Sequence, residues 1–186
     1  MIISCIFAAA CKTDSIKPLS DYNAGFSGIT TVNAKVETTK YIDGEKELDV
    51  TTVFDGRKLY AVINFVYGRK DIMYIDGTDL YYKKGGGDWN IYYEPNGFSD
   101  DLAIIRAFLD ESLYDKTEKA AEHLYVSKDQ AVLPDYDGNK ALGAKITINK
   151  DFLFLEFTGI EDSLDFIITM KITLGGQKVI IPEEIL

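Results

Sequence analysis

Apolar and polar residues alternate over much of this chain. Val32, Ala34 and Val36 are separated by single polar residues, which is the period of two that a half-buried β-strand shows. Other apolar or alternating segments predict strands over 48–54, 59–67, 72–75, 80–82, 89–93, 142–148, 152–157, 164–174 and 178–181. Asp-Gly pairs at 43–44, 55–56, 76–77 and 137–138 suit tight hairpin turns, because both residues tolerate a positive φ. The pattern therefore predicts a meander of antiparallel strands.

The period changes near residue 99. Ser99 is placed to cap a helix, and Asp100 and Asp101 put negative charge at the positive end of its dipole. Apolar residues then recur every three or four positions, as on one face of a helix: Leu102, Ile105, Leu109 and Leu113. This spacing predicts a helix that follows the first group of strands.

A second helix is predicted directly after the first. It starts at Asp115, with Glu118 three residues later, and continues through Ala121 to Tyr125. Strands, a helical insertion and further strands give an α+β fold, with helices packed on one side of a curved antiparallel sheet. Residues 12–24 are polar and predict a tether that precedes the sheet.

Several predicted strands are apolar on both faces. Residues 59–66 and 152–157 show this most clearly, whereas a sheet with one wet face alternates more cleanly. Either protein covers both faces as a packed core, or one face lines a cavity that an apolar ligand fills. For the cavity interpretation, the candidate lining residues are Phe65, Met73, Tyr82, Trp89, Phe108, Phe154 and Phe166.

The order of these elements resembles the LolA-like half-barrel family of lipoprotein carriers and lipid-binding envelope lipoproteins. The resemblance spans about 26–182 and rests on the meander through 72–82, the Gly-rich turn into Trp89, the helical insertion and the closing segment 176–182. It implies an unclosed half-barrel with helices across its mouth and a hollow for acyl chains. Family members open with a helix before the first strand, and the sequence predicts no good helix in residues 12–25.

The start of the chain has the pattern of a bacterial lipoprotein signal. An apolar stretch passes through Ala8, Ala9 and Ala10 to Cys11, and such a cysteine carries the lipid. Residues 1–10 contain no basic residue, which such signals normally have, and this points to a truncated signal. The alternative is an ordinary N-terminal strand or helix with a buried cysteine. The lipoprotein interpretation divides the chain into a signal (1–10), a lipidated cysteine and tether (11–25) and one domain (26–186).

Charge and cysteine content agree with this division. The formal net charge is −10, which disfavours binding to nucleic acid or to anionic headgroups through the protein surface. The two cysteines are Cys5 and Cys11, so residues 26–186 contain no thiol for a disulfide, a zinc cluster or a nucleophile.

Catalytic and metal motifs find little support. His123 is the one histidine, it falls in the second predicted helix, and no Gly-x-Ser-x-Gly elbow accompanies it. Residues 135–139 resemble a calcium loop only faintly, and turn chemistry explains them more simply. The Asp100-Asp101 pair is explained by helix capping, and Gly85-Gly86-Gly87 lacks the lysine of a phosphate loop. We therefore expect no enzyme, cofactor or metal site.

These observations predict an extracytoplasmic protein held to a bacterial membrane by the lipid on Cys11. Its half-barrel is expected to bind a lipid or another apolar ligand non-covalently, through burial of acyl chain. The alternative is a packed, ligand-free module that contacts another envelope protein through its exposed aromatic residues.

Overall fold

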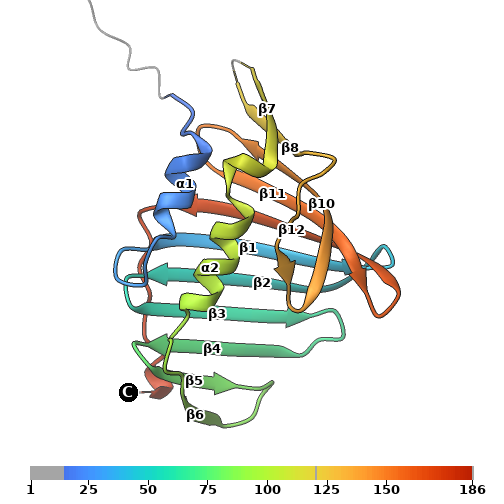
Figure 1. Ribbon diagram of the computed structural model, residues 1–186. Coiled ribbons are helices and arrows are strands. Elements are labelled where there is room, and N and C mark those ends of the chain that lie inside the picture. The colour runs from blue at the N-terminus through green and yellow to red at the C-terminus, as the bar shows by residue number, and fades with distance from the viewer. Residues whose placement is uncertain (1–14, 120, 186) are drawn as a thin grey trace, which may run out of the picture.

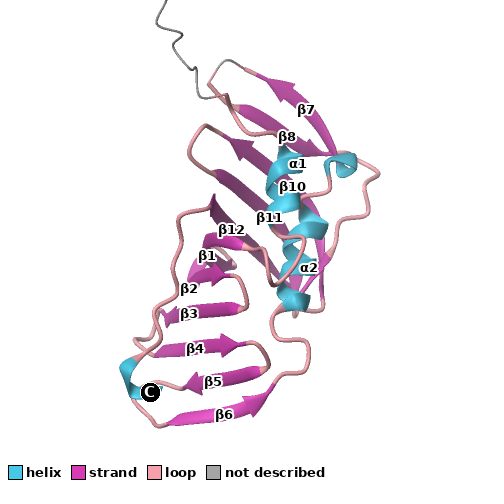
Figure 2. Cartoon of the chain, turned by 90° about the vertical axis from the view of Figure 1, so that its left-hand side faces the viewer, coloured by secondary structure: helices cyan, strands magenta, loops and turns pink. Residues whose placement is uncertain are grey.

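One large antiparallel sheet dominates the computed structural model, which describes residues 15–119 and 121–185 (Figure 1). Its strands lie in the order β6-β5-β4-β3-β2-β1-β12-β11-β10-β8-β7, and the short β9 pairs with β10. The two ends of this order, β6 and β7, do not pair with each other, so the sheet is unclosed. It is curved, with helices on one side (Figure 2). This confirms the curved antiparallel sheet that the pattern predicts, and the sheet is unclosed as the resemblance implies.

The strands of the sheet are contributed by both halves of the chain. The first half supplies β1 (Asn33–Ile42), β2 (Glu45–Asp55), β3 (Lys58–Phe65), β4 (Lys70–Asp76), β5 (Asp79–Lys83) and β6 (Trp89–Tyr93). The second half supplies β7 (Tyr114–Glu118), β8 (His123–Ser127), β9 (Asp135–Tyr136), β10 (Asn139–Ile148), β11 (Leu153–Glu161) and β12 (Leu164–Leu174). The helical elements are α1 (Leu19–Gly25), α2 (Ser99–Phe108) and the 3₁₀ turns η1 (Glu111–Leu113) and η2 (Glu183–Ile185).

All four Asp-Gly pairs lie where the sequence predicts hairpin turns. They connect β1 to β2, β2 to β3, β4 to β5 and β9 to β10. In the first and last of these turns both residues have positive φ, as a type I′ turn requires: Asp43 (50°), Gly44 (79°), Asp137 (52°) and Gly138 (78°). The β11–β12 hairpin uses Asp162 and Ser163 at φ 50° and 72°, which no glycine in the sequence signals.

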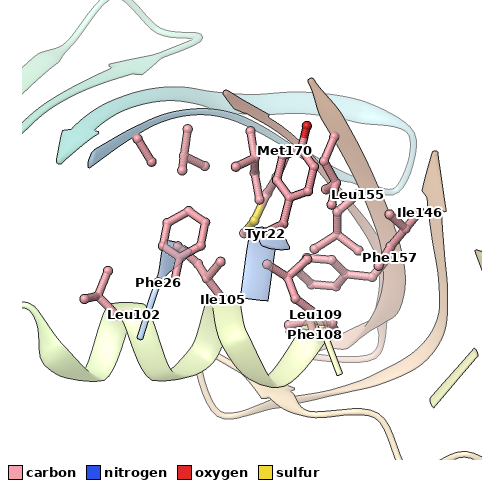
Figure 3. Packing of buried hydrophobic residues seen from close by; sticks show 14 of the residues in the cluster. Tyr22, Phe26, Leu102, Ile105, Phe108, Leu109, Ile146, Leu155, Phe157 and Met170 are labelled. Carbon is pink, nitrogen blue, oxygen red and sulfur yellow. The ribbon is translucent and has the colours of Figure 1, made fainter. Parts of the chain in front are cut away.

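The hydrophobic core lies between the concave face of the sheet and the two helices (Figure 3). Phe108 of α2 stacks on Phe157 of β11 with ring centroids 4.3 Å apart. The hydroxyl of Tyr114 donates a buried hydrogen bond of 2.7 Å to the carbonyl oxygen of Phe108, at the end of α2. Burial raises the pKa of Tyr114 well above its ordinary value. The helix is thus held at its C-terminal end by stacking and by a side-chain cap.

Residues 19–25, which the sequence places in a polar tether, form helix α1 instead. Leu19 and Tyr22 are buried in the core, and Asn23 Nδ2 donates to the carbonyl oxygen of Arg106 at 2.9 Å. Two apolar side chains three residues apart are enough to hold this short helix against the sheet, because tertiary packing stabilises it more than intrinsic propensity does. A helix therefore does precede the first strand.

The second predicted helix is wrong. Residues 114–118 and 123–127 form the antiparallel pair β7–β8, and β8 continues the sheet beside β10. Tyr125 is fully buried opposite Ile146, so a strand buries this ring in the core. His123 accordingly lies on β8, half-buried, and not on a surface helix. Short segments such as these fit both periods, and the pairing of β8 with β10 and β7 fixes the extended conformation.

Two smaller expectations are corrected as well. Residues 178–181 form no strand; they cross the convex side of the sheet, where Val179 N donates to Asp55 Oδ2 at 3.3 Å. Ser99 does not cap α2, because its Oγ donates back to the carbonyl oxygen of Asn96 at 2.8 Å. Asp100 and Asp101 do occupy the first turn of the helix, as predicted.

Candidate functional site: an apolar cavity between the sheet and α2

A cavity of about 320 Å³ lies between the concave face of the sheet and α2. The floor consists of side chains from β1, β2, β3, β4 and β12, and α2 with the β9–β10 turn forms the opposite wall. Its apolar lining residues are Val36, Val50, Phe54, Leu59, Ala61, Ile63, Met73, Ile104, Ile105 and Met170. The volume is at the lower end of the range for ligand pockets, and the lining has the apolar character that such pockets share.

The cavity arises because short side chains lie on the floor beneath a helix. Thr52 of β2 and Ala61 of β3 are cross-strand partners, and Thr38 also lines the floor. The side chains that reach across from the helix and from β12 include Ile105 and Met170, which point into the space between them in Figure 3. Small residues at the centre of the floor leave a space that these longer side chains do not fill.

Part of the apolar lining remains accessible. Val50, Ile63 and Met73 are only partly buried, although each lies on the face of the sheet that α2 covers. When a ligand covers exposed apolar surface inside a concavity, burial of that surface stabilises the complex by about 25 cal/mol per Å². The cavity is therefore suited to an apolar ligand.

Carboxylates lie at the opening of the cavity. Asp101 of α2 and Asp137 of the β9–β10 turn both line the cavity and both have exposed side chains. Protein around the Asp101 carboxyl reduces its hydration and raises its pKa, and the negative charges of Asp100 and Glu94 raise it further. Tyr136, also in the lining, has its pKa raised mainly by burial. The cavity thus combines an apolar interior with an acidic rim at its opening.

Of the seven candidate lining residues, Met73 lines this cavity. Phe65 lies on the same face, beneath the guanidinium of Arg69, whose Cζ is 3.9 Å from the ring centroid. Phe108 and Phe166 are fully buried in the core. The structure thus places these three aromatic rings away from the cavity lining.

The other three candidates make contacts elsewhere. Tyr82 donates a hydrogen bond of 2.6 Å to Oδ2 of the buried Asp71. Trp89 lies on the convex face, and its indole N–H donates to Glu184 Oε2 at 3.0 Å. Phe154 also lies on the convex face, opposite Lys171. Strand parity decides the positions of Trp89 and Phe154, because one residue of shift moves a side chain to the other face. Tyr82 is the cross-strand partner of Met73 and shares its face, but its hydroxyl is bound to Asp71.

Most lining residues are absent from the sequence-based candidates, because those candidates are mainly large aromatic residues. The floor instead uses aliphatic residues and threonines at alternate positions of β1, β2 and β3. The available signal was the alternation itself: Val36 and Thr38, Val50 and Thr52, or Leu59 and Ala61, each two residues apart. That signal identifies a face but not what covers it.

The two acidic motifs that the sequence explains by turn and capping chemistry lie in a turn and in a helix. Residues 135–139 form the β9–β10 hairpin, and Asp100-Asp101 form the first turn of α2. In the part of the chain that the structure describes, no three His, Cys, Asp or Glu side chains are grouped as metal ligands. Within residues 15–119 and 121–185, no helix has the length and apolarity needed to cross a membrane. Comparison of the chain with protein-family models and with curated proteins finds no match.

Proposed function

We propose that this protein binds a lipid or another apolar ligand non-covalently in the cavity beneath α2. The observation that carries the proposal is the partly exposed apolar lining of a concave space between helix and sheet. Each methylene of an acyl chain that moves from water into such a space gains about 0.8 kcal/mol. An unclosed antiparallel sheet with helices on its concave side agrees with the resemblance to the LolA-like half-barrel family.

We also propose that the protein is a bacterial lipoprotein, anchored outside the cytoplasm by lipid on Cys11. This proposal rests on the sequence around Cys11, which lies outside the described residues. Lipid attachment and cavity are independent features, so each needs its own experiment. A palmitoyl or similar chain on Cys11 anchors the protein, whereas the cavity holds a separate, exchangeable ligand.

Cavity filling tests the binding function. Thr52→Phe places a ring in the floor of the cavity, and Thr51→Phe places the same ring on the opposite face of the same strand. Both variants are made in the Cys11→Ala full chain, which has no thiol at residue 11. We expect the neutral dye N-phenyl-1-naphthylamine to fluoresce with the parent and with Thr51→Phe, and at least tenfold less with Thr52→Phe.

Two results would contradict the binding proposal. One is the absence of dye binding by a folded parent chain, checked by circular dichroism. The other is equal binding by the two phenylalanine variants. Native mass spectrometry adds an independent test, because a parent chain purified without detergent is expected to carry an apolar molecule that Thr52→Phe loses.

Membrane fractionation tests the anchor. Cys11→Ala is expected to move the protein from the membrane fraction to the soluble fraction. Cys5→Ala, within the proposed signal, is the control, because it leaves Cys11 lipidated and the protein in the membrane fraction. Continued membrane retention of Cys11→Ala would refute lipidation at this residue. Intact mass of the membrane-extracted protein gives the size of the attached chains.

The exposed edge strand β6 supports a second candidate function. Ile91, Tyr92 and Tyr93 are 68%, 53% and 73% exposed. β6 ends the sheet order, and among the described residues only β5 pairs with it. Such an edge offers backbone groups and apolar side chains to another envelope protein. In this alternative the purified chain carries no apolar molecule and Thr52→Phe has no effect on its function.

A further inference from the structure

The opening of the cavity carries negative charge and no built-in positive charge. Of the residues that line it, Asp101 and Asp137 are acidic, and none is Lys, Arg or His. Asp100 and Glu94 lie near enough to Asp101 to raise the pKa of its carboxyl. A ligand whose apolar part fills the cavity has its polar end at this rim, because the interior offers chiefly aliphatic side chains.

Lys40, on the same face of the sheet, is already paired with two carboxylates. Lys40 of β1 lies two residues beyond Thr38, which lines the cavity floor. Its Nζ is 2.7 Å from Glu161 Oε2 and 3.1 Å from Glu47 Oε2. The two carboxylates outnumber the single ammonium, so this group has a formal net charge of −1 and offers no free cation to an anionic headgroup.

From these observations, and resting on the proposed binding function, we infer that the ligand is an amphiphile with a cationic head and an apolar tail. An alkylammonium compound places its tail in the cavity and its charge beside Asp101 and Asp137. A headgroup with a sulfate, phosphate or carboxylate charge meets like charges at the same place. The rim thus selects the headgroup, and the cavity selects only for apolarity.

The magnitude of this selection is set by the position of the carboxylates. Both side chains are exposed, so solvent screens their interaction with a ligand and each contributes modestly. Two such carboxylates together are expected to give about a tenfold preference for a cation over an anion of the same chain length at low ionic strength. The preference should fall with added salt.

Three probes of equal chain length test this inference: dodecyltrimethylammonium, dodecyl sulfate and monododecanoylglycerol, each below its critical micelle concentration. Displacement of N-phenyl-1-naphthylamine from the Cys11→Ala full chain gives the affinity of each. The expected order is cation, then neutral, then anion. Thr52→Phe serves as the control for binding elsewhere on this acidic surface. Isothermal titration calorimetry, which needs no bound dye, should show that this variant has a lower affinity for all three probes.

Charge removal at the rim has closely matched controls. Asp101→Asn with Asp137→Asn removes both lining carboxylates, and asparagine suits the positive φ at residue 137. Asp88→Asn with Asp43→Asn removes the same charge from two exposed residues outside the cavity lining, and residue 43 lies in an equivalent type I′ turn. The first pair should reduce the cation-to-anion preference at least fivefold, and the second pair should leave it within twofold.

The outcomes separate this inference from the binding proposal. Equal affinity for the cation and the anion, a preference for the anion, or an equal effect of both double variants would overturn the inference while the neutral probe still binds. If none of the three probes displaces the dye, or if Thr52→Phe changes nothing, the binding proposal itself fails and the headgroup inference fails with it.

Discussion

The ring of Phe166 on β12 lies directly over Gly159 on β11. A Cβ atom at residue 159 would be 2.3 Å from Phe166 Cζ and 2.5 Å from the carbonyl oxygen of Lys140. Real Cβ atoms do not approach other atoms this closely, so the position is closed to any other residue unless the neighbours move. Gly159 and Phe166 are cross-strand partners, and the ring of Phe166 occupies the space that a side chain at residue 159 would need.

Gly159→Ala is expected to lower the free energy of unfolding by about 2 kcal/mol, because a ring and a backbone oxygen must both shift. Gly143→Ala on β10 is the matched control, since its Cβ would meet Thr158 Oγ1 at an ordinary 3.5 Å. Urea denaturation followed by circular dichroism measures both. In a Phe166→Leu background Gly159→Ala should cost less, and full additivity of the two changes would contradict the steric explanation.

Ser163→Gly is expected to stabilise the protein. Ser163 has a φ of 72° in the β11–β12 turn, a conformation that costs an L-residue about 1 kcal/mol relative to glycine. The reverse change, Gly138→Ser, puts the same side chain at a φ of 78° in the β9–β10 turn and should cost a similar amount. Thermal unfolding is the measurement. A lower midpoint for Ser163→Gly, or an unchanged one for Gly138→Ser, would show that backbone strain does not decide these turns.

Asp71 is expected to make stability depend on pH in the acid range. It is 1% exposed; its Oδ2 accepts from Tyr82 and its Oδ1 accepts from Gly85 N. Burial raises the pKa of Asp71, but these hydrogen bonds and the nearby Arg69 outweigh it and leave the pKa below its ordinary value. A lowered folded-state pKa adds stability above the unfolded-state value of about 3.9, and this stability is lost as the pH falls through the folded-state value.

Asp71→Asn should therefore cost about 3 kcal/mol near neutral pH and should flatten the fall in stability below about pH 4. The exposed Asp88 gives a control through Asp88→Asn, which leaves the Asp71 hydrogen bonds in place. Urea titrations from pH 7 to pH 2.5 provide the comparison. If Asp71→Asn and the parent chain lose stability in parallel as the pH falls, the acid sensitivity has another source.

Tyr114→Phe removes the O–H that donates to the carbonyl oxygen of Phe108 and should cost about 1 kcal/mol. Since this hydrogen bond holds the end of α2, the amides of that helix should also exchange faster with solvent. Tyr93→Phe, at a side chain that is 73% exposed, is the control for the lost hydroxyl. Unchanged exchange in 99–108 would mean that stacking on Phe157 alone holds the helix.

How much of this fold could be predicted from sequence depended on the range of the interactions. The four Asp-Gly turns were predictable, because adjacent residues set their conformation: the glycine has a positive φ in all four turns and the aspartate in two. The helix at 99–108 was predictable from its apolar spacing and its acidic first turn. In contrast, 114–127 offered short segments that fit either period, and pairing with β10 decided in favour of strands.

The candidate site was predictable only in part for the same reason. Alternation along β2 and β3 shows that Thr52 and Ala61 share a face with larger aliphatic residues. It does not show that α2 crosses this face, nor that short side chains meet beneath the helix. Met73 lines this space, whereas Trp89 lies on the convex face because of strand parity.

By itself, the sequence determined most of the strands, the four Asp-Gly turns, the amphipathic helix α2 and the cysteine pattern around residue 11, because each depends on residues close together in the chain. Only the tertiary structure decided that 19–25 is a helix with Leu19 and Tyr22 buried in the core, that Phe166 lies over Gly159, and that a cavity with an acidic rim lies between α2 and the sheet. These features depend on side-chain volumes from segments far apart in the sequence. The volume of the cavity is therefore set only when folding has brought those segments together.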